Sequence, residues 1–427
     1  MDTTTYPMTI GQLSVHRDVE RIPADRLWEG NLQPLVWDIR TECTVEDVWQ
    51  ALAGLAERHE SLRTNFLFEA DGSPRQFLGA ASGAEALERV DRGVADIAEL
   101  PTLLATKHQE ALDIYHGIPW RAWVITEDGV PAKVLYVVHH MTADGAASLI
   151  MQADFHALLA GESLPPVAGQ PITLALDQQG AGAFRLRAAE RYWRRTLEAA
   201  PRVPSSEATT SAAADPQMFG ATLETGIPLE VAHAGAEKLD VSLATVVLAA
   251  YYHALRTALN RPELLLMAIS ANRFDPSMAG VVTSLTQWAP MLLDFDGSEP
   301  FAELAAKVHG KALNGFKNSI CDPDYVVNIR EEYFEKADPP ADKGFNTNII
   351  LAPPGFAPAV EQQPRSVDFA TPARSFGPGF YFIVSAIERI GVTVRCHRPD
   401  VDRAALATIL DVFQETLLKV ADLPAMG

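Results

Sequence analysis

The sequence predicts an α/β protein that folds as two lobes. Segments typical of buried strands alternate along the chain with segments of helical periodicity, which is the pattern of α/β domains. The chain has 427 residues, more than a single hydrophobic core usually serves. Residues 199–217 are rich in Pro, Ser, Thr and Ala and lack apolar periodicity, as linkers do. We therefore predict an N-terminal lobe over residues 1–176 and a C-terminal lobe over residues 177–427, with the linker-like stretch inside the second lobe.

Periodicity predicts the individual elements in order. Short runs rich in β-branched and aromatic residues predict strands, and apolar residues recurring every three or four positions predict helices. In the N-terminal lobe the predicted elements are a strand at 32–39, a helix at 45–59, strands at 120–125 and 134–140, and a helix at 146–159. In the C-terminal lobe they are an arginine-bearing helix around 185–195, a strand at 221–227, a long apolar helix at 243–259, strands at 264–269 and 345–351, a hairpin of 381–387 with 392–397, and a closing helix at 403–420.

Composition excludes several classes of protein. A hydrophobic content of 48% and a charged content of 21% are ordinary for a globular protein with large cores. The formal net charge of −20 repels phosphate backbones, so we expect no nucleic-acid partner. The N-terminus lacks the basic and apolar regions of a secretory signal, and no apolar run reaches the roughly 18 residues of a membrane span. We therefore expect a cytoplasmic protein that does not enter a membrane.

The cysteines and histidines do not indicate a metal site. Cys43, Cys321 and Cys396 lie far apart, without a C-x-x-C pair or a nearby histidine, so we expect free, buried thiols. No further histidine, cysteine or carboxylate stands at a familiar ligand spacing from the histidine pair at 139–140. We expect no bound metal.

The segment most informative about function is Val-Val-His-His-Met-Thr-Ala-Asp-Gly at 137–145. It places two imidazoles at the end of a buried strand, and because adjacent strand residues point to opposite faces, only one of His139 and His140 can face a cleft. A neutral imidazole, with a pKa of about 6.5, can take a proton from an amine or a hydroxyl. Asp144 could fix the loop by pairing with an arginine, and Gly145 would let a substrate approach the backbone closely. Taken alone, the pair is compatible with a catalytic and with a structural role.

The pattern His-His-x-x-x-Asp-Gly resembles the signature of the condensation domains of nonribosomal peptide synthetases. These domains are relatives of chloramphenicol acetyltransferase and of other acyltransferases that use carrier proteins or CoA. Three further segments are similar to motifs of that family and follow in the family's order: Arg-His-Glu-Ser-Leu-Arg-Thr-Asn-Phe at 58–66, Arg-Tyr-Trp-Arg-Arg-Thr-Leu at 191–197, and Ala-Ile-Ser-Ala-Asn-Arg at 268–273. The resemblance covers nearly the whole chain.

Other segments depart from the family pattern. The first motif is reduced to residues 9–13, and Gln287 stands where an asparagine is usual. Residues 318–327 are only loosely similar to the sixth motif. The resemblance therefore indicates the chemistry more strongly than the choice of substrate.

The resemblance implies α+β sandwich lobes of the chloramphenicol acetyltransferase type, paired as a V-shaped pseudo-dimer with a central tunnel. His140 would lie in the middle of this tunnel as the catalytic base, or as the group that positions the attacking amine or hydroxyl. His139 is expected to pack and to hydrogen-bond at the end of the strand.

The family motifs also imply supporting roles. Asp144 and Arg273 are expected to form a salt bridge that ties the signature loop to the second lobe, and Gly145 completes the loop. Arg58 and Arg63 are expected to support the same loop. A buried bidentate pair of this kind holds geometry better than it adds stability.

A row of basic residues on one predicted helix has two interpretations. Arg187, Arg191 and Arg195 either form a solvated face or provide a landing site for an acidic carrier protein. The second interpretation suits the family, whose partners deliver substrates on a phosphopantetheine arm. We expect no cofactor bound by this chain itself, because the partner carrier protein supplies the arm.

The function predicted from these observations is that of a free-standing condensation enzyme. It would transfer an acyl group from a carrier-protein thioester, supplied in trans, to a small amine or alcohol acceptor, free or carrier-bound. The product would be an amide or an ester in nonribosomal peptide or hybrid natural-product biosynthesis, as in the making of antibiotics. One alternative is an acyltransferase that uses acyl-CoA or a polyketide carrier, and another is a docking module without catalysis. The intact His140, Asp144 and Arg273 argue against the docking module, and the absence of a G-x-S-x-G motif argues against a serine hydrolase.

Overall fold

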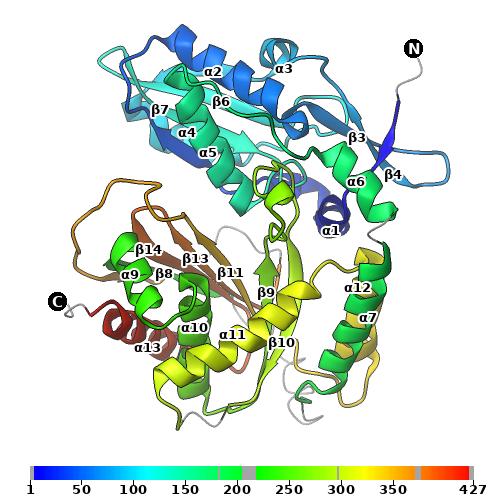
Figure 1. The fold of residues 1–427 in the computed structure, drawn as a ribbon, viewed down its shortest axis with the longest axis vertical. Coiled ribbons are helices and arrows are strands. Elements are labelled where there is room, and N and C mark those ends of the chain that lie inside the picture. The colour runs from blue at the N-terminus through cyan, green and yellow to red at the C-terminus, as the bar shows by residue number, and fades with distance from the viewer. Residues whose placement is uncertain (1–3, 181–182, 204–217, 296–297, 371–376, 423–427) are drawn as a thin grey trace. The chain divides into compact units, whose positions relative to one another are not determined.

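The computed structural model describes residues 4–180, 183–203, 218–295, 298–370 and 377–422. They form two compact units (Figure 1). The first unit takes its residues from Met1–Phe184 and from Ala271–Gln287, and the second from Arg185–Ser270 and Trp288–Gly427. We call Ala271–Gln287 the return segment, because the chain leaves the second unit there and comes back to the first.

This division differs from the expected one in two respects. The first unit ends at 184 rather than at 176, and it includes the return segment, which we expected in the C-terminal lobe. The reason lies in hydrogen bonds that attach the return segment to the first unit, described below. Most of the linker-like stretch, residues 204–217, lies outside the described residues.

The main sheet of the first unit has the strand order β2-β7-β6-β5. Its strands are β2 (Leu35–Asp38), β5 (Arg92–Asp96), β6 (Trp120–Glu127) and β7 (Val130–Val138). Strands β6 and β7 are antiparallel, and Glu127 pairs with Val130 across a two-residue turn. Both turn residues, Asp128 and Gly129, have positive φ, which is the geometry that an Asp-Gly hairpin favours.

Helices cover both faces of this sheet. On one face, α2 (Val45–Arg58) and α5 (Gly145–Leu159) close a core in which Tyr136 stacks on Trp37 and Trp120 at ring separations of 5.0 and 5.1 Å. On the other face, α4 (Leu100–His108) packs against side chains of β6 and β7. Burial on both faces explains why these strands are almost continuously apolar.

The remaining elements of the first unit form a smaller layer. A second sheet has the order β1-β4-β3. The elements of this layer are β1 (Tyr6–Pro7), α1 (Ile10–Val19), β3 (Thr64–Phe68), β4 (Pro74–Leu78) and α6 (Pro171–Gln179), whereas α3 (Gly83–Arg89) packs on α2 and contributes Ala86 to the core of the main sheet. Thr9 and Gln12 form a capping box that begins α1.

The second unit is built on a mixed sheet with the order β10-β9-β11-β13-β14-β8-β12. The strands are β8 (Phe219–Pro228), β9 (Leu264–Ser270), β10 (Gln287–Leu293), β11 (Phe345–Leu351), β12 (Ser366–Asp368), β13 (Phe380–Ala386) and β14 (Arg389–Cys396). The helices on one side of it are α9 (Leu229–Lys238), α10 (Leu243–Leu259), α11 (Phe301–Lys317) and α13 (Arg403–Ala421) (Figure 1). Tyr251 of α10 stacks on Phe382 of β13 at 4.4 Å, so the aromatic core lies between these helices and the sheet.

Two further helices form a separate core in the second unit. They are α7 (Ala183–Glu198) and α12 (Pro323–Glu331). Trp193 of α7 is fully buried in this core, near Tyr333 and Phe334. Among the described residues, none of the helices is both long and apolar enough to cross a membrane.

The predicted elements are confirmed throughout, with shifts at their ends. The helix predicted at 243–259 matches α10, and the hairpin of 381–387 with 392–397 corresponds to the antiparallel pair β13 and β14. The strand predicted to end at 140 ends at Val138, because His139 makes only an isolated bridge to Asn31.

Candidate functional site

The His-His-x-x-x-Asp-Gly segment connects strand β7 to helix α5. Its first residues stay attached to backbone after the strand has ended: the N–H of His139 donates to Pro119 O at 3.0 Å, and that of His140 donates to Gly30 O at 2.8 Å. Helix α5 begins at Gly145, as predicted from the pattern within one residue. We call residues 139–145 the signature loop.

His139 is a buried, neutral residue of the loop. Its side chain is 3% exposed, and its Nδ1 accepts a hydrogen bond of 3.2 Å from the N–H of Met141, so the ring proton is on Nε2. Burial, with a smaller electrostatic effect of the neighbouring His140 and His16 side chains, lowers the pKa of His139 to about 3. The ring also fills the space beside Gly30, where an added β-carbon would lie 2.7 Å from Nε2. These contacts suit a structural role.

His140 has the opposite tautomer. Its ring is partly buried, and Nδ1 lies 3.2 Å from the carbonyl oxygen of Ala143. Because a carbonyl can only accept, Nδ1 carries the proton whenever this bond forms with neutral His140, and Nε2 is left with the lone pair. The ring is therefore arranged to accept a proton or a hydrogen bond at Nε2.

Asp144 connects the signature loop to its neighbours through three hydrogen bonds. It is fully buried and is the N-cap of α5, where Oδ1 accepts from the N–H of Ala147 at 2.8 Å. Its Oδ2 accepts from Arg273 Nη1 at 2.9 Å and from the N–H of Leu285 at 2.8 Å. The carboxylate thus ties the signature loop to α5 and to the return segment.

The guanidinium of Arg273 uses all five of its N–H groups. Nη1 donates to Asp144 and to Ala271 O at 2.9 and 3.0 Å. Nε and Nη2 both donate to Val281 O, and Nη2 also donates to Thr283 O at 2.9 Å. Arg273 therefore hydrogen-bonds three carbonyls of the return segment and connects that segment to the signature loop through Asp144. The ion pair joins the loop to residues of the first unit, not to the second lobe as expected.

The two arginines expected to support the loop act elsewhere. Arg58 donates through Nε to Asp154 on α5 at 2.7 Å, so it braces the helix that follows the loop. Arg63 donates to the carbonyl of Ala56 in α2 and to the carbonyls of Ala80 and Ala81. It therefore joins the last turn of α2 to the chain after β4, and these bonds do not reach the signature loop.

The contact from this motif to the loop comes from Ser61. Its side chain is buried, and Oγ donates to Thr142 O at 2.5 Å. Ser61 is not among the site residues expected from the sequence. A serine inside an Arg-His-Glu-Ser-Leu-Arg run has no feature of its own that indicates such a contact.

The arginine row on α7 has the expected exposure. Arg187, Arg191 and Arg195 are exposed and four residues apart, so they lie along one face of the helix. Their neighbour Arg194 instead forms a bidentate ion pair with Glu332, at 2.9 and 3.2 Å. Among the described residues, the three exposed arginines form no ion pair.

In the described part of the chain, neither the cysteines nor the other metal-binding residue types form a metal site. Among the described residues, Cys43, Cys321 and Cys396 form no disulfide, and burial raises the pKa of each thiol. Cys321 and Cys396 are buried as expected, whereas Cys43 is only partly buried. Within the described ranges, no three His, Cys, Asp or Glu side chains are grouped so as to hold a metal ion.

Comparisons with known proteins place these features in one family. Surfactin synthase subunit 1 of Bacillus subtilis is 24% identical over 337 residues, which is 75% of this chain and 9% of that protein, so the chain spans less than a tenth of this relative. The solved condensation domain of the monacolin K polyketide synthase MokA matches with a TM-score of 0.75 at 16% identity, covering 99% of this chain and 98% of that one.

Two further structures show how widely the fold is used. A structure that describes condensation domain-mediated chain release from the enacyloxin polyketide synthase matches with a TM-score of 0.74 at 18% identity, over 100% of this chain and 84% of that one. The epimerization domain from the third module of tyrocidine synthetase B matches with a TM-score of 0.67 at 15% identity, over 98% of each chain. These likenesses confirm the mixed α/β fold, with two lobes of the chloramphenicol acetyltransferase type. The family model described as Condensation domain matches residues 28–336. The chain belongs to the condensation domain family.

Proposed function

We propose that this protein is a condensation enzyme that transfers an acyl group from a carrier-protein thioester to an amine or hydroxyl acceptor. Members of its family act in nonribosomal peptide synthesis and related pathways, as its relatives' names indicate. The single observation that carries the proposal is the tautomer of His140. Its Nδ1–H is engaged by the Ala143 carbonyl, which leaves the Nε2 lone pair as the acceptor.

The reaction requires only this one proton acceptor. The acceptor nitrogen or oxygen attacks the thioester carbonyl while its N–H or O–H proton moves to, or is held by, Nε2 of His140. The tetrahedral intermediate then expels the thiolate of the phosphopantetheine arm, which takes up the proton. The products are an amide or ester and the free carrier thiol. The thioester is already activated, so no protein nucleophile is needed.

The surrounding residues keep the imidazole in place. His139 is held neutral with its proton on Nε2, so it does not compete for the proton at physiological pH. Asp144 and Arg273 fix the end of the loop, and each is fully hydrogen-bonded. In the proposed reaction, these residues position His140 and do not contact the reacting atoms.

The arginine row on α7 is the surface we propose for carrier docking. Arg187, Arg191 and Arg195 are unpaired among the residues described, on a chain of net charge −20. A row of this kind attracts an acidic protein by local charge, and that attraction weakens as salt screens it.

Charge reversal tests the docking surface. Replacing all three arginines with glutamate is expected to raise the apparent KM for an acyl-carrier donor about tenfold. It should leave the KM for a short soluble thioester of the same acyl group nearly unchanged. Lys336→Glu, at an exposed lysine of the same unit, is the matched control and should change neither value. Equal effects of the triple replacement on both donors would contradict carrier docking on this row.

The alternative with a specific observation in its favour is transfer from a polyketide carrier or from acyl-CoA. Of the three structures compared above, the two with TM-scores of 0.75 and 0.74 come from polyketide synthases. The docking-module alternative has less support, since the His140 geometry is intact. The epimerization domain of the same fold shows that the fold alone does not determine the reaction.

Product analysis tests the proposed function directly. The protein is incubated with acyl groups presented on a carrier protein, on CoA and on a short thiol, each with a panel of amines and alcohols. Intact-mass measurement should show free carrier thiol appearing together with acylated acceptor. Release of the free acid alone, or turnover of acyl-CoA with no turnover of any carrier thioester, would contradict carrier-dependent condensation.

A further inference from the structure

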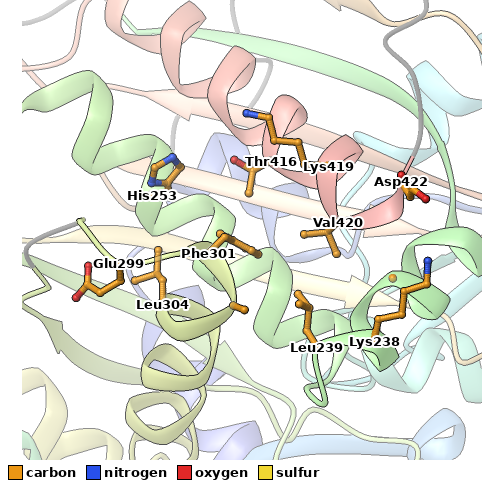
Figure 2. A pocket seen from close by; sticks show the side chains of 12 residues that line it. Lys238, Leu239, His253, Glu299, Phe301, Leu304, Thr416, Lys419, Val420 and Asp422 are labelled. Atoms are coloured by element: carbon orange, nitrogen blue, oxygen red, sulfur yellow. The ribbon is translucent and has the colours of Figure 1, made fainter.

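A pocket of about 590 Å³ opens in the second unit between helices α9, α10, α11 and α13 (Figure 2). All of its lining residues belong to the second unit, whereas His140 and the signature loop belong to the first. The volume falls in the range of small-molecule sites, roughly 300–1,000 Å³. The proposed function gives this pocket no role.

The pocket has an apolar wall. Phe301, Leu239 and Val420 line it and are each only half-buried, so their apolar surface faces the opening. Leu304 is buried at the floor. Beside this wall, α9 and α13 are in close contact at Gly235, where an added β-carbon would lie 2.4 Å from Val420 O. An apolar chain placed along this wall would remove the side chains from water.

The other lining residues of the pocket include polar side chains that carry positive charge. Figure 2 shows His253, Thr416 and Lys419 along one side, with Lys238 at the far end. Both lysines are exposed, and within the described residues neither ammonium group forms an ion pair. The positive charge is therefore available to a ligand.

The acidic groups at the pocket only partly offset this charge. Glu299 is held by Lys307, whose Nζ lies 3.0 Å from its carboxylate, and the Glu299 side chain is 8% exposed. Asp422 is exposed at the end of α13, on the side of Lys238 in Figure 2. The half of the pocket near His253 and Lys419 is thus the more positive one.

The pKa of His253 reflects the nearby positive charges. Burial, followed by the charges of Arg256 on its own helix and Lys419 on α13, lowers the pKa of His253. Glu299, at the beginning of the α11 segment, also lines this part of the pocket but is paired. A neutral imidazole beside two cations can donate a hydrogen bond from its ring N–H to a bound anion.

We infer that this pocket binds an amphipathic carboxylate, a small acid with an unbranched apolar chain. The carboxylate would lie beside Lys419 and His253, and the chain would follow Phe301, Leu239 and Val420. The inference concerns a second binding site and does not depend on acyl transfer at His140.

Calorimetric titration of the whole chain with decanoate tests the inference, with decanol as the uncharged ligand of equal chain length. We expect decanoate to bind one site per chain and decanol to bind more weakly. Lys419→Gln should weaken decanoate binding about two- to fivefold, the range of a partly exposed ion pair. Leu239→Trp, which fills the apolar wall, should weaken it more than about tenfold. Lys311→Gln on α11, outside the pocket, is the matched control.

Two controls separate this site from the reaction site and from unfolding. His140→Ala should bind decanoate as the unchanged protein does, so loss of transfer activity leaves this test intact. A melting temperature is measured for each variant, and Lys419→Gln changes only an exposed side chain. In NMR titrations, decanoate should raise the pKa of His253. Absence of binding, equal binding of decanol, or unchanged binding by folded Lys419→Gln and Leu239→Trp would overturn the inference.

Discussion

The burial of His139 makes the stability of this protein depend on pH in a way that can be calculated. The pKa of His139 is about 3 in the folded protein, against an ordinary value of 6.5 in an unfolded chain. Below pH 6.5 the unfolded chain takes up a proton at this residue and the folded protein does not. The stability present above pH 6.5 is therefore lost progressively as the pH falls towards 3.

The size of the effect follows from the distance between the two pKa values. Each pH unit in this window costs about 1.4 kcal/mol, so lowering the pH from 6.5 to 5 costs about 2 kcal/mol of unfolding free energy from this residue alone. His139 is 3% exposed, so solvent screening does not reduce this figure appreciably. Burial lowers the pKa of His59, His156 and His253 as well, and these residues add to the total loss.

A variant comparison isolates the contribution of His139. His139→Asn keeps an acceptor for the N–H of Met141 but cannot titrate. Denaturant unfolding at pH 7 and pH 5 should show that this variant loses about 2 kcal/mol less than the unchanged protein between the two pH values. The other histidines contribute equally to both proteins and cancel. His116→Asn, at an 86% exposed histidine, should lose as much as the unchanged protein. If His139→Asn also loses as much, the neutral buried state of His139 is refuted.

Two further predictions concern the support of the signature loop. Asp144→Ala and Arg273→Ala should each lower the free energy of unfolding by about 3–5 kcal/mol, because each leaves a buried charge without its partner. The double variant should lose less stability than the sum of the two single losses. Strictly additive losses in denaturant unfolding would show that the two residues are not coupled. Ser61→Ala should lower the free energy of unfolding by about 1 kcal/mol, because it removes the hydrogen bond to the Thr142 carbonyl. The loosened loop should lower kcat with KM unchanged, whereas a raised KM at constant kcat would place Ser61 in substrate binding instead.

The elements predicted from sequence are those with strong apolar patterns. Strands β6 and β7 are buried on both faces and α10 is apolar over most of its length, so their residues alone indicate them. Strand β5 lies outside the predicted elements because Arg-Gly-Val-Ala-Asp is short and charged at both ends. The return segment could not be predicted either, because it depends on five hydrogen bonds from one arginine to residues whose positions only the folded chain defines.

The candidate site was predictable in its motif but not in its geometry. The pairing of Asp144 with Arg273 was implied by the family resemblance, and the structure contains that ion pair. The tautomers of His139 and His140 are set by one backbone N–H and one carbonyl within the loop, which no residue pattern encodes. The contact of Ser61 with Thr142 joins residues 81 positions apart through a single hydroxyl.

A single-turnover measurement tests whether His140 Nε2 accepts the proton of the attacking amine or hydroxyl. Acyl transfer from an acyl-carrier thioester is followed for the unchanged protein, for His140→Ala and for the exposed control His116→Ala, each with its melting temperature. We expect His140→Ala to slow transfer by about 10²–10⁴-fold without a change in melting temperature, while His116→Ala transfers at the unchanged rate. A folded His140→Ala variant that transfers the acyl group at the unchanged rate would contradict this role of His140.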